Sequence, residues 1–184
     1  MAATDVAALY FRRGNLEQAL QVLQKEIIPV FERLGDERSL AITLGRIADI
    51  HQARGQQDEA LRIRVEEELP VFERLGDLRE RAVTLGQIAD IHHARGQLDE
   101  ALRIRLEEQL PIFERLGDIR SRAVTMVKIG DIHHARGQLD EALRIFREEA
   151  LPVFEQMGDT RSVALIRTRI GHIDQARSQS GKAL

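Results

Sequence analysis

The chain has 184 residues, a formal net charge of −3 and a pI near 6.1. Its acidic and basic residues are interspersed, without the basic block that marks a nucleic-acid or membrane surface. It contains no cysteine, which excludes a disulfide framework, thiol catalysis and thiolate metal sites. The N-terminus lacks a signal-peptide pattern, and no uncharged apolar run approaches the ~18 residues that span a bilayer. We therefore expect a cytoplasmic protein with neither nucleic-acid nor membrane partners.

The sequence is internally repeated. The turn glycines and one proline per repeat recur with a period of 41 residues, at Gly14, Gly55, Gly96 and Gly137 and at Pro29, Pro70, Pro111 and Pro152. A fixed period of this length is typical of proteins built from stacked repeats. We place the repeats at about residues 1–34, 35–75, 76–116 and 117–157, followed by a terminal helix at 158–184. They form a single predicted domain, because no linker divides them.

Two amphipathic helices are predicted in each repeat, because apolar residues recur at helical spacing on both sides of the turn glycine. Gly96 can end the first helix in a left-handed conformation, and Gly117 can end the second, with Asp118 capping the next helix. We expect a short first helix at about 3–13, second helices at about 16–34, 57–75, 98–116 and 139–157, and a last first-type helix at about 160–177. Such short turns make paired helices antiparallel. The predicted fold class is all-α, a solenoid of stacked helix pairs.

Each repeat carries a pattern of apolar, small, turn and acidic residues, which in the third repeat are Leu85, Ile88-Ala89, His92, Gly96, Leu98 and Glu100-Ala101. This pattern resembles the tetratricopeptide repeat, whose aromatic position is kept as Tyr10 in the first repeat. The family's usual period is about 34 residues, so the longer period here is most similar to the long-repeat branch of kinesin light chain, Pins/LGN-type scaffolds and bacterial regulators. The resemblance implies a right-handed solenoid that binds a protein or peptide in the concave groove of its first helices, with no catalysis and no cofactor.

A proline lies well inside the second helix of each repeat. Pro111 sits in an apolar pattern that continues through Phe113 and Leu116, although proline cannot donate a backbone hydrogen bond and crowds the carbonyl of Glu107. Each repeat is also one residue longer than the LGN-like unit, in the segment that carries the proline. We hypothesise a π-type turn or kink just before each proline, which accommodates both features. The alternative is a plain break, with proline as the first residue of a short new helix.

The resemblance places a set of candidate partner-binding residues on the concave face. They comprise one aspartate in each of three repeats (Asp49, Asp90 and Asp131), the residue three positions after it (Gln52, His93 and His134) and the residue three positions before it (Arg46, Gln87 and Lys128). Residues three apart share one helix surface, so the groove would bind a basic or polar peptide, with pH sensitivity near the histidine pKa. Gly45 and Gly86 would leave room for a close-packed backbone. The alternative is a solvated polar face whose aspartates pair with Arg46, Lys128 or Arg169 of adjacent repeats.

Other polar residues have simpler interpretations. A metal site is disfavoured, because Asp-x-x-His supplies two ligands per repeat and zinc or iron needs three or four. His51, His92 and His133 stand at the family's aromatic position, so we expect them to be partly buried packing residues. Arg103 and Arg105, with the neighbouring glutamates, are expected to form a solvated face of ion pairs. The family's clamp for a C-terminal carboxylate is absent, so acidic chaperone tails are not expected to bind.

We interpret the chain as a protein-interaction module. The sequence suggests no serine, histidine and aspartate combination for nucleophilic catalysis, so an enzyme is not expected. Two alternatives stay open. One is a sensory or regulatory repeat segment of a larger, bacterial multidomain signalling protein, and the other is a structural repeat that self-associates through open solenoid ends.

Overall fold

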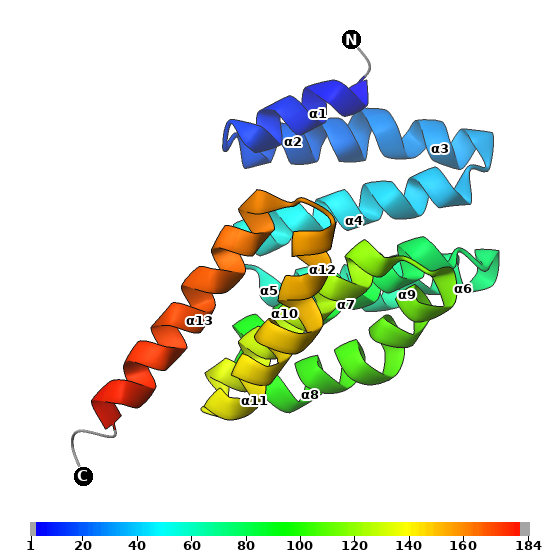
Figure 1. The fold of residues 1–184 in the computed structure, drawn as a ribbon. Helices are drawn as coiled ribbons and strands as arrows, with labels where there is room; N and C mark the ends of the chain where they lie inside the picture. The colour runs from blue at the N-terminus through cyan, green and yellow to red at the C-terminus, as the bar shows by residue number, and fades with distance from the viewer. Residues whose placement is uncertain (1–2, 181–184) are drawn as a thin grey trace. The chain divides into compact units, whose positions relative to one another are not determined.

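The computed structural model describes residues 3–180, and all of its regular elements are helical. The α-helices are α1 (Ala3–Arg12), α2 (Leu16–Val22), α3 (Ile28–Leu34), α4 (Glu37–Ala53), α5 (Gln57–Arg62), α6 (Leu69–Leu75), α7 (Leu78–Ala94), α8 (Leu98–Arg103), α9 (Leu110–Leu116), α10 (Ile119–Ala135), α11 (Leu139–Arg144), α12 (Leu151–Gln156) and α13 (Thr160–Ser180) (Figure 1). The predicted all-α class is therefore confirmed. The last residues of the terminal helix predicted at 158–184 lie outside the described range.

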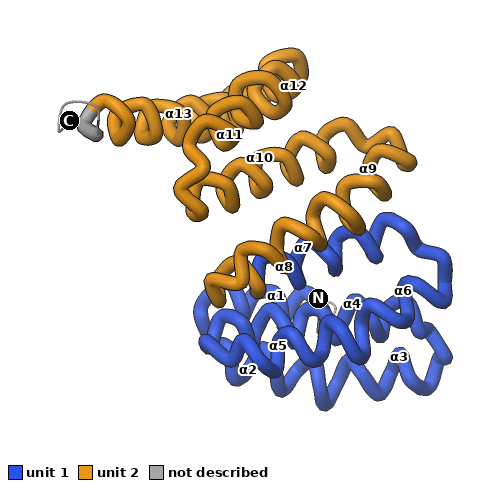
Figure 2. Tube along the Cα trace, turned by 90° about the horizontal axis from the view of Figure 1, so that it is seen from below, with its two compact units in different colours: residues 1–91 blue, residues 92–184 orange. Residues whose placement is uncertain are grey.

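The chain forms two compact units, residues 1–91 and 92–184 (Figure 2). The division falls near the C-terminal end of α7. Each unit has its own buried cluster of aliphatic side chains, and the cluster of unit 2 also contains two phenylalanines. The prediction of a single domain over 1–184 stays a prediction.

In unit 1, α4 is the central first-type helix. It contacts α2 and α3 of the preceding repeat and α5 and α6 of its own repeat, while α1 packs on α2 (Figure 1). Gly35 ends α3 with a φ of 65°, a left-handed conformation that favours glycine. Asp36 then caps α4 by accepting a hydrogen bond from the backbone N–H of Ser39 at 3.0 Å. Only Gly35 and Asp36 therefore separate the end of α3 from the start of α4.

In unit 2, α10 has the corresponding central position and contacts α8, α9, α11 and α12. The terminal helix α13 packs on α11 and α12. Phe146 and Phe154 are fully buried in this unit. A Cβ placed on Gly130 would lie only 2.6 Å from Cε1 of Phe146, so the absence of a side chain on α10 is what lets the aromatic ring approach this helix.

A π-helical segment precedes the proline of each repeat. The segments are η1 (Leu23–Ile27), η2 (Ile63–Glu68), η3 (Ile104–Gln109) and η4 (Ile145–Ala150). In η2 the N–H of Leu69 donates to the carbonyl of Arg64, five residues back, and the backbone stays in the right-handed helical region. The helix therefore widens without breaking. The π-turn hypothesis is confirmed, and the plain break is wrong.

The widened turn accommodates the missing proline donor. Leu69 bonds to Arg64, and Pro70 has no N–H, so the carbonyls of Val65 and Glu66 lie at the gap in the hydrogen-bond ladder. Both residues are exposed, and water can therefore satisfy these carbonyls.

Charged side chains of the π-helical segments face the core. Ile63 and Arg64 are adjacent in sequence, yet they are 3% and 0% exposed, and Glu68 is 5% exposed. Arg105 occupies the equivalent position in the third repeat and is 3% exposed, so the expectation that it belongs to a solvated face is wrong. Arg103 does lie on such a face and pairs with three glutamates of its own second helix. Arg64 and Arg105 follow the buried Ala60 and Ala101 by four residues, so they lie on the core-facing side of their helices.

Candidate functional site

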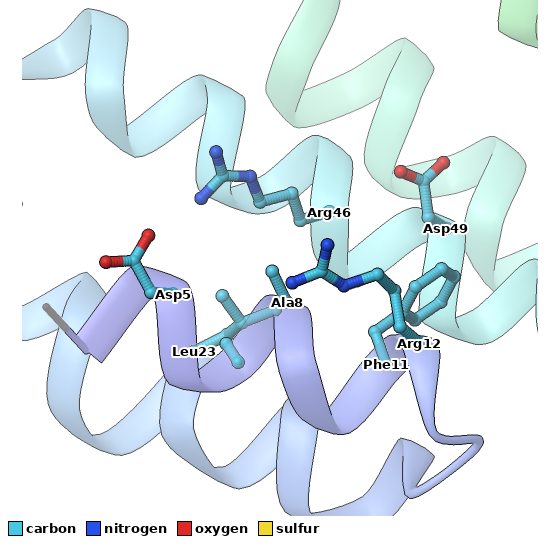
Figure 3. A pocket seen from close by; sticks show the side chains of 8 residues that line it. Asp5, Ala8, Phe11, Arg12, Leu23, Arg46 and Asp49 are labelled. Carbon is cyan, nitrogen blue, oxygen red and sulfur yellow. The ribbon is translucent and has the colours of Figure 1, made fainter. Parts of the chain in front are cut away.

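A pocket of about 420 Å³ opens between α1 and α4 in unit 1 (Figure 3). It is lined by Asp5, Ala7, Ala8, Phe11, Arg12, Leu23, Arg46 and Asp49. Ala7 and Leu23 are buried beneath it, and Phe11 is 39% exposed. Charged side chains therefore surround an apolar base, as in ligand pockets of this size. Two predicted site residues, Arg46 and Asp49, lie together here.

The cationic groups of the pocket come from both helices. The guanidinium groups of Arg12, from α1, and Arg46, from α4, extend into the space between the helices (Figure 3). Both side chains are exposed. Arg46 favours the ionised form of nearby Asp49 through its charge, but neither arginine makes a hydrogen bond or close ion pair within residues 3–180.

Asp49 is held from the side of the core by Arg64. The fully buried guanidinium of Arg64 binds the Asp49 carboxylate, donates to Glu68 Oε2 at 2.9 Å and donates to Gln87 Oε1 at 2.6 Å. Thr84 adds a hydrogen bond to Glu68 Oε1 at 3.1 Å. One buried cation thus holds two carboxylates and an amide, which links η2 to both α4 and α7. We call these five residues the Arg64 network.

Burial raises the pKa of both carboxyl groups in the Arg64 network. For Glu68, loss of solvation is the largest cause of the raised pKa, and the negative charge of Asp49 adds to it, although Arg64 opposes the shift. The pKa of Asp49 is raised for the same principal reason. Two acids share one guanidinium, so the charge of Arg64 cannot fully compensate both of them.

The pH dependence of stability should reveal Glu68. Between the ordinary glutamate value of 4.5 and the raised pKa, the folded chain retains a proton that the unfolded chain has lost. The Glu68 contribution to the free energy of unfolding therefore falls as pH rises through this window. Glu68→Gln copies Gln109 of the third repeat and removes that fall. Urea titrations from about pH 4 to 8 should show the variant gaining stability relative to wild type as pH rises; a constant difference would contradict this cause.

Asp131 pairs with an arginine of the following repeat. Arg169 on α13 donates through Nε to Asp131 Oδ1 at 2.7 Å and through a terminal nitrogen to Oδ2 at 3.2 Å. This two-point contact is the geometry that favours arginine over lysine. The alternative of aspartates paired with basic residues of adjacent repeats is thus confirmed for Asp131, whereas Asp49 binds Arg64 of its own repeat.

The other predicted residues do not gather in one site within a unit. Gln87 belongs to the Arg64 network. Asp90, Gln52, His93 and Lys128 are half-buried on their first-type helices, and His134 is exposed. A role for these residues in partner binding stays a prediction.

The histidines at the aromatic position lie at the turn between helices. Their Nδ1 atoms are hydrogen-bonded to the Oε1 of a glutamine five residues later, in the pairs His51–Gln56, His92–Gln97 and His133–Gln138, at 2.6–2.7 Å. All three histidines are half-buried. The prediction that they are partly buried packing residues is confirmed, and their side chains also fix the turn that the glycine forms.

Gly45 makes room for a side chain rather than for a partner's backbone. A Cβ on Gly45 would lie 2.4 Å from Glu68 Oε1 and 2.8 Å from Glu68 Cδ. The space over Gly45 is therefore filled from within the protein, and the expectation that it was left open is wrong. Sequence reasoning missed Glu68 and Arg64 because it assigned the middle of the second helix to the solvated face. The signal that could have found them is their helical spacing, four and eight residues after Ala60.

Two further observations limit the kinds of site. Among the described residues, no group of three histidine, cysteine or acidic side chains is arranged to hold a metal ion. No helix within residues 3–180 has both the length and the apolar character that a membrane crossing requires.

Comparisons with known proteins agree with this architecture. Family models described as tetratricopeptide repeat match residues 80–156 and 2–25. The chain belongs to the tetratricopeptide-repeat family. No curated protein matches the sequence.

Solved structures show a similar fold. A Podosopora anserina protein, described as the nearly identical TPR-like repeats of a kinesin light chain, superposes on this chain with a TM-score of 0.74 at 19% identity. The match covers 98% of this chain and 88% of that one. BtubC (BKLC) from P. vanneervenii superposes with a TM-score of 0.70 at 17% identity, covering 96% of this chain and 80% of that one. At these identities the likeness concerns the fold. It supports the similarity of fold to kinesin light chain repeats. The match to the tetratricopeptide-repeat models supports a protein-interaction repeat module.

Proposed function

We propose that the protein binds a peptide segment of a partner protein on the surface of its first-type helices. The observation that carries this proposal is the pocket between α1 and α4, which combines an apolar base with charged groups at its rim. Such pockets position a ligand through a few polar contacts while apolar burial supplies affinity. The pocket is also lined by Arg46 and Asp49, which the resemblance to the tetratricopeptide repeat placed among the candidate partner-binding residues.

The partner segment does not need to be basic. Two of the three aspartates that would attract a basic segment, Asp49 and Asp131, are already bound by Arg64 and Arg169. An aspartate that already has an arginine partner gains little from a second cation, especially when it is half exposed. These aspartates therefore attract an additional positive charge less strongly than unpaired carboxylates would.

Peptides selected from a random library provide the test. The selected peptide is titrated into ¹⁵N-labelled protein, and the backbone amide signals that shift are assigned. We expect saturable shifts of the amide signals in α1 and α4. The dissociation constant should be micromolar or weaker, a binding free energy of about −8 kcal/mol at most, because the peptide must be ordered on binding.

A matched pair of substitutions on the two faces of unit 1 serves as control. Gln52→Ala, on α4, should weaken binding, whereas Glu66→Ala, on the exposed side of η2, should leave the affinity unchanged. Shifts confined to η1, α3 and η2, or a loss of affinity in Glu66→Ala alone, would place binding on the second helices and refute the proposal.

A further inference from the structure

The ion pair between Arg169 and Asp131 joins two successive first-type helices at a residue spacing that recurs in the sequence. The two residues are 38 positions apart, and the arginine of the later helix reaches back to the aspartate of the earlier one. The same sequence relation links Asp90 with Lys128 and Asp49 with Gln87. Each of these three pairs has a carboxylate as its earlier member.

The first pair of this series lacks its carboxylate. Arg46 is the later member, and the residue 38 positions before it is Ala8, on α1. Both residues line the pocket between α1 and α4. At the position that Asp131 has relative to Arg169, Arg46 therefore has an exposed alanine instead of a carboxylate. Ala8 and Arg46 both border the pocket (Figure 3).

A second cation lies beside this gap. Arg12 is one helical turn after Ala8 on the same face of α1, and its guanidinium extends into the same space as that of Arg46. The two anionic side chains of the lining do not occupy these arginines: Asp49 is bound to Arg64, and Asp5 makes no ion pair with either arginine within the described residues.

We propose that this pocket takes an acidic side chain of the partner peptide, whose carboxylate occupies the place of the one missing at Ala8. The proposal rests on the proposed function and specifies the chemistry of its partner. The carboxylate binds Arg46 and Arg12, and an apolar neighbour in the peptide covers Phe11. A small dianion such as phosphate is less suited, because Asp5 and Asp49 repel a second negative charge and the apolar base provides no polar contact for it.

This site differs from the clamp that the family uses for a C-terminal carboxylate, whose residues are absent from the matching positions of α4 and α7. The proposed site consists of Arg12 of α1 and Arg46 of α4 instead, and it binds a side-chain carboxylate within a peptide.

Two blocked peptides test the proposal: acetyl-Ala-Leu-Glu-Leu-Ala-amide and the same peptide with Gln in place of Glu. Both are titrated into ¹⁵N-labelled protein up to ~10 mM, and the arginine side-chain Nε–H signals are followed together with the amides of α1 and α4. We expect the Glu peptide to shift the Arg46 and Arg12 signals and to bind at least about tenfold more tightly than the Gln peptide. Raising the salt concentration should reduce the difference in affinity between the Glu and Gln peptides, because salt screens the ion pairs.

The chain itself supplies the matched variants. Ala8→Asp restores the aspartate found at 49, 90 and 131, and should fill the gap from within and lower affinity for the Glu peptide about tenfold. Arg46→Gln copies Gln87 and should remove the preference for Glu over Gln. Unchanged amide dispersion shows that both variants are folded.

The outcomes separate the two proposals. Equal binding of both peptides to α1 and α4 would overturn the acidic preference and leave the interaction surface standing. Full affinity of Ala8→Asp for the Glu peptide, or no Glu-dependent shift at ~10 mM, would also overturn the acidic site. Shifts on the second helices alone would overturn both proposals.

Discussion

Replacing Arg64 by methionine should lower the free energy of unfolding by about 3–5 kcal/mol. Methionine has a similar length, so the loss comes from charge and hydrogen bonding more than from volume. Arg64 is 0% exposed and is the cation of the Arg64 network. Without it, Glu68 keeps only the hydrogen bond from Thr84 in a buried setting, and an uncompensated buried charge is costly. Urea unfolding measures the loss.

A double variant separates the cost of an unpaired charge from the value of the ion pair itself. Arg64→Leu with Glu68→Ile copies the first repeat, which has Leu23 and Ile27 at these positions, both buried. Replacing a buried ion pair by apolar residues is often neutral or stabilising. The double variant should therefore recover most of the stability that Arg64→Met loses. If it is as unstable as the single variant, the cost lies in local packing and the charge argument fails.

Gly130→Ala should lower the free energy of unfolding by about 1–3 kcal/mol, even though alanine is the better helix former. The added Cβ would lie 2.6 Å from Cε1 and 2.9 Å from Cζ of Phe146. The ring is 0% exposed, so it cannot move aside without disturbing its neighbours. Thermal or urea unfolding of the variant checks the loss.

Two controls accompany this variant. Gly171→Ala on α13 meets nothing within 4 Å, so it should raise the free energy of unfolding by up to about 1 kcal/mol through helix propensity alone. Gly130→Ala combined with Phe146→Leu copies the pair Ala7 and Leu23 of the first repeat and should recover much of the loss. Gly130→Ala behaving like Gly171→Ala would show that the ring relaxes freely.

The repeat pattern predicted the backbone well because glycine and proline act locally. Gly35, Gly76, Gly117 and Gly158 all have positive φ, at 62–68°, as expected of residues that end a helix before an aspartate. The π-helical turn could be foreseen as well, because Pro111 and one extra residue in the same segment leave few ways to continue a helix.

The buried arginines could not be predicted in the same manner. Arg105 was assigned to the solvated face because of its charge and its neighbouring glutamates, although it follows the buried Ala101 by four residues and shares its helix face. Their chemistry also varies between repeats: the same position holds Leu23, Arg64, Arg105 and Phe146. A buried polar network depends on partners from three helices, and no single helix pattern specifies it.

The candidate site was predicted in part. Arg46 and Asp49 do share one pocket, but the contribution of Arg12 and Phe11 from the shorter first helix was missed. The signal that could have found them is the break in the aspartate series at Ala8, because a repeat that departs from its own pattern leaves a neighbour without its usual partner.

Photo-crosslinking of a bound peptide tests most directly whether partners bind on the first-type helices. The photoreactive residue p-benzoylphenylalanine replaces Phe11, on α1, or Leu34, on α3, in separate proteins. Both are exposed apolar residues of the same repeat, at 39% and 70% exposure. A peptide selected for binding should crosslink at position 11 and not at position 34, and excess unlabelled peptide should suppress the product. Crosslinking at position 34 alone would contradict the proposed binding surface.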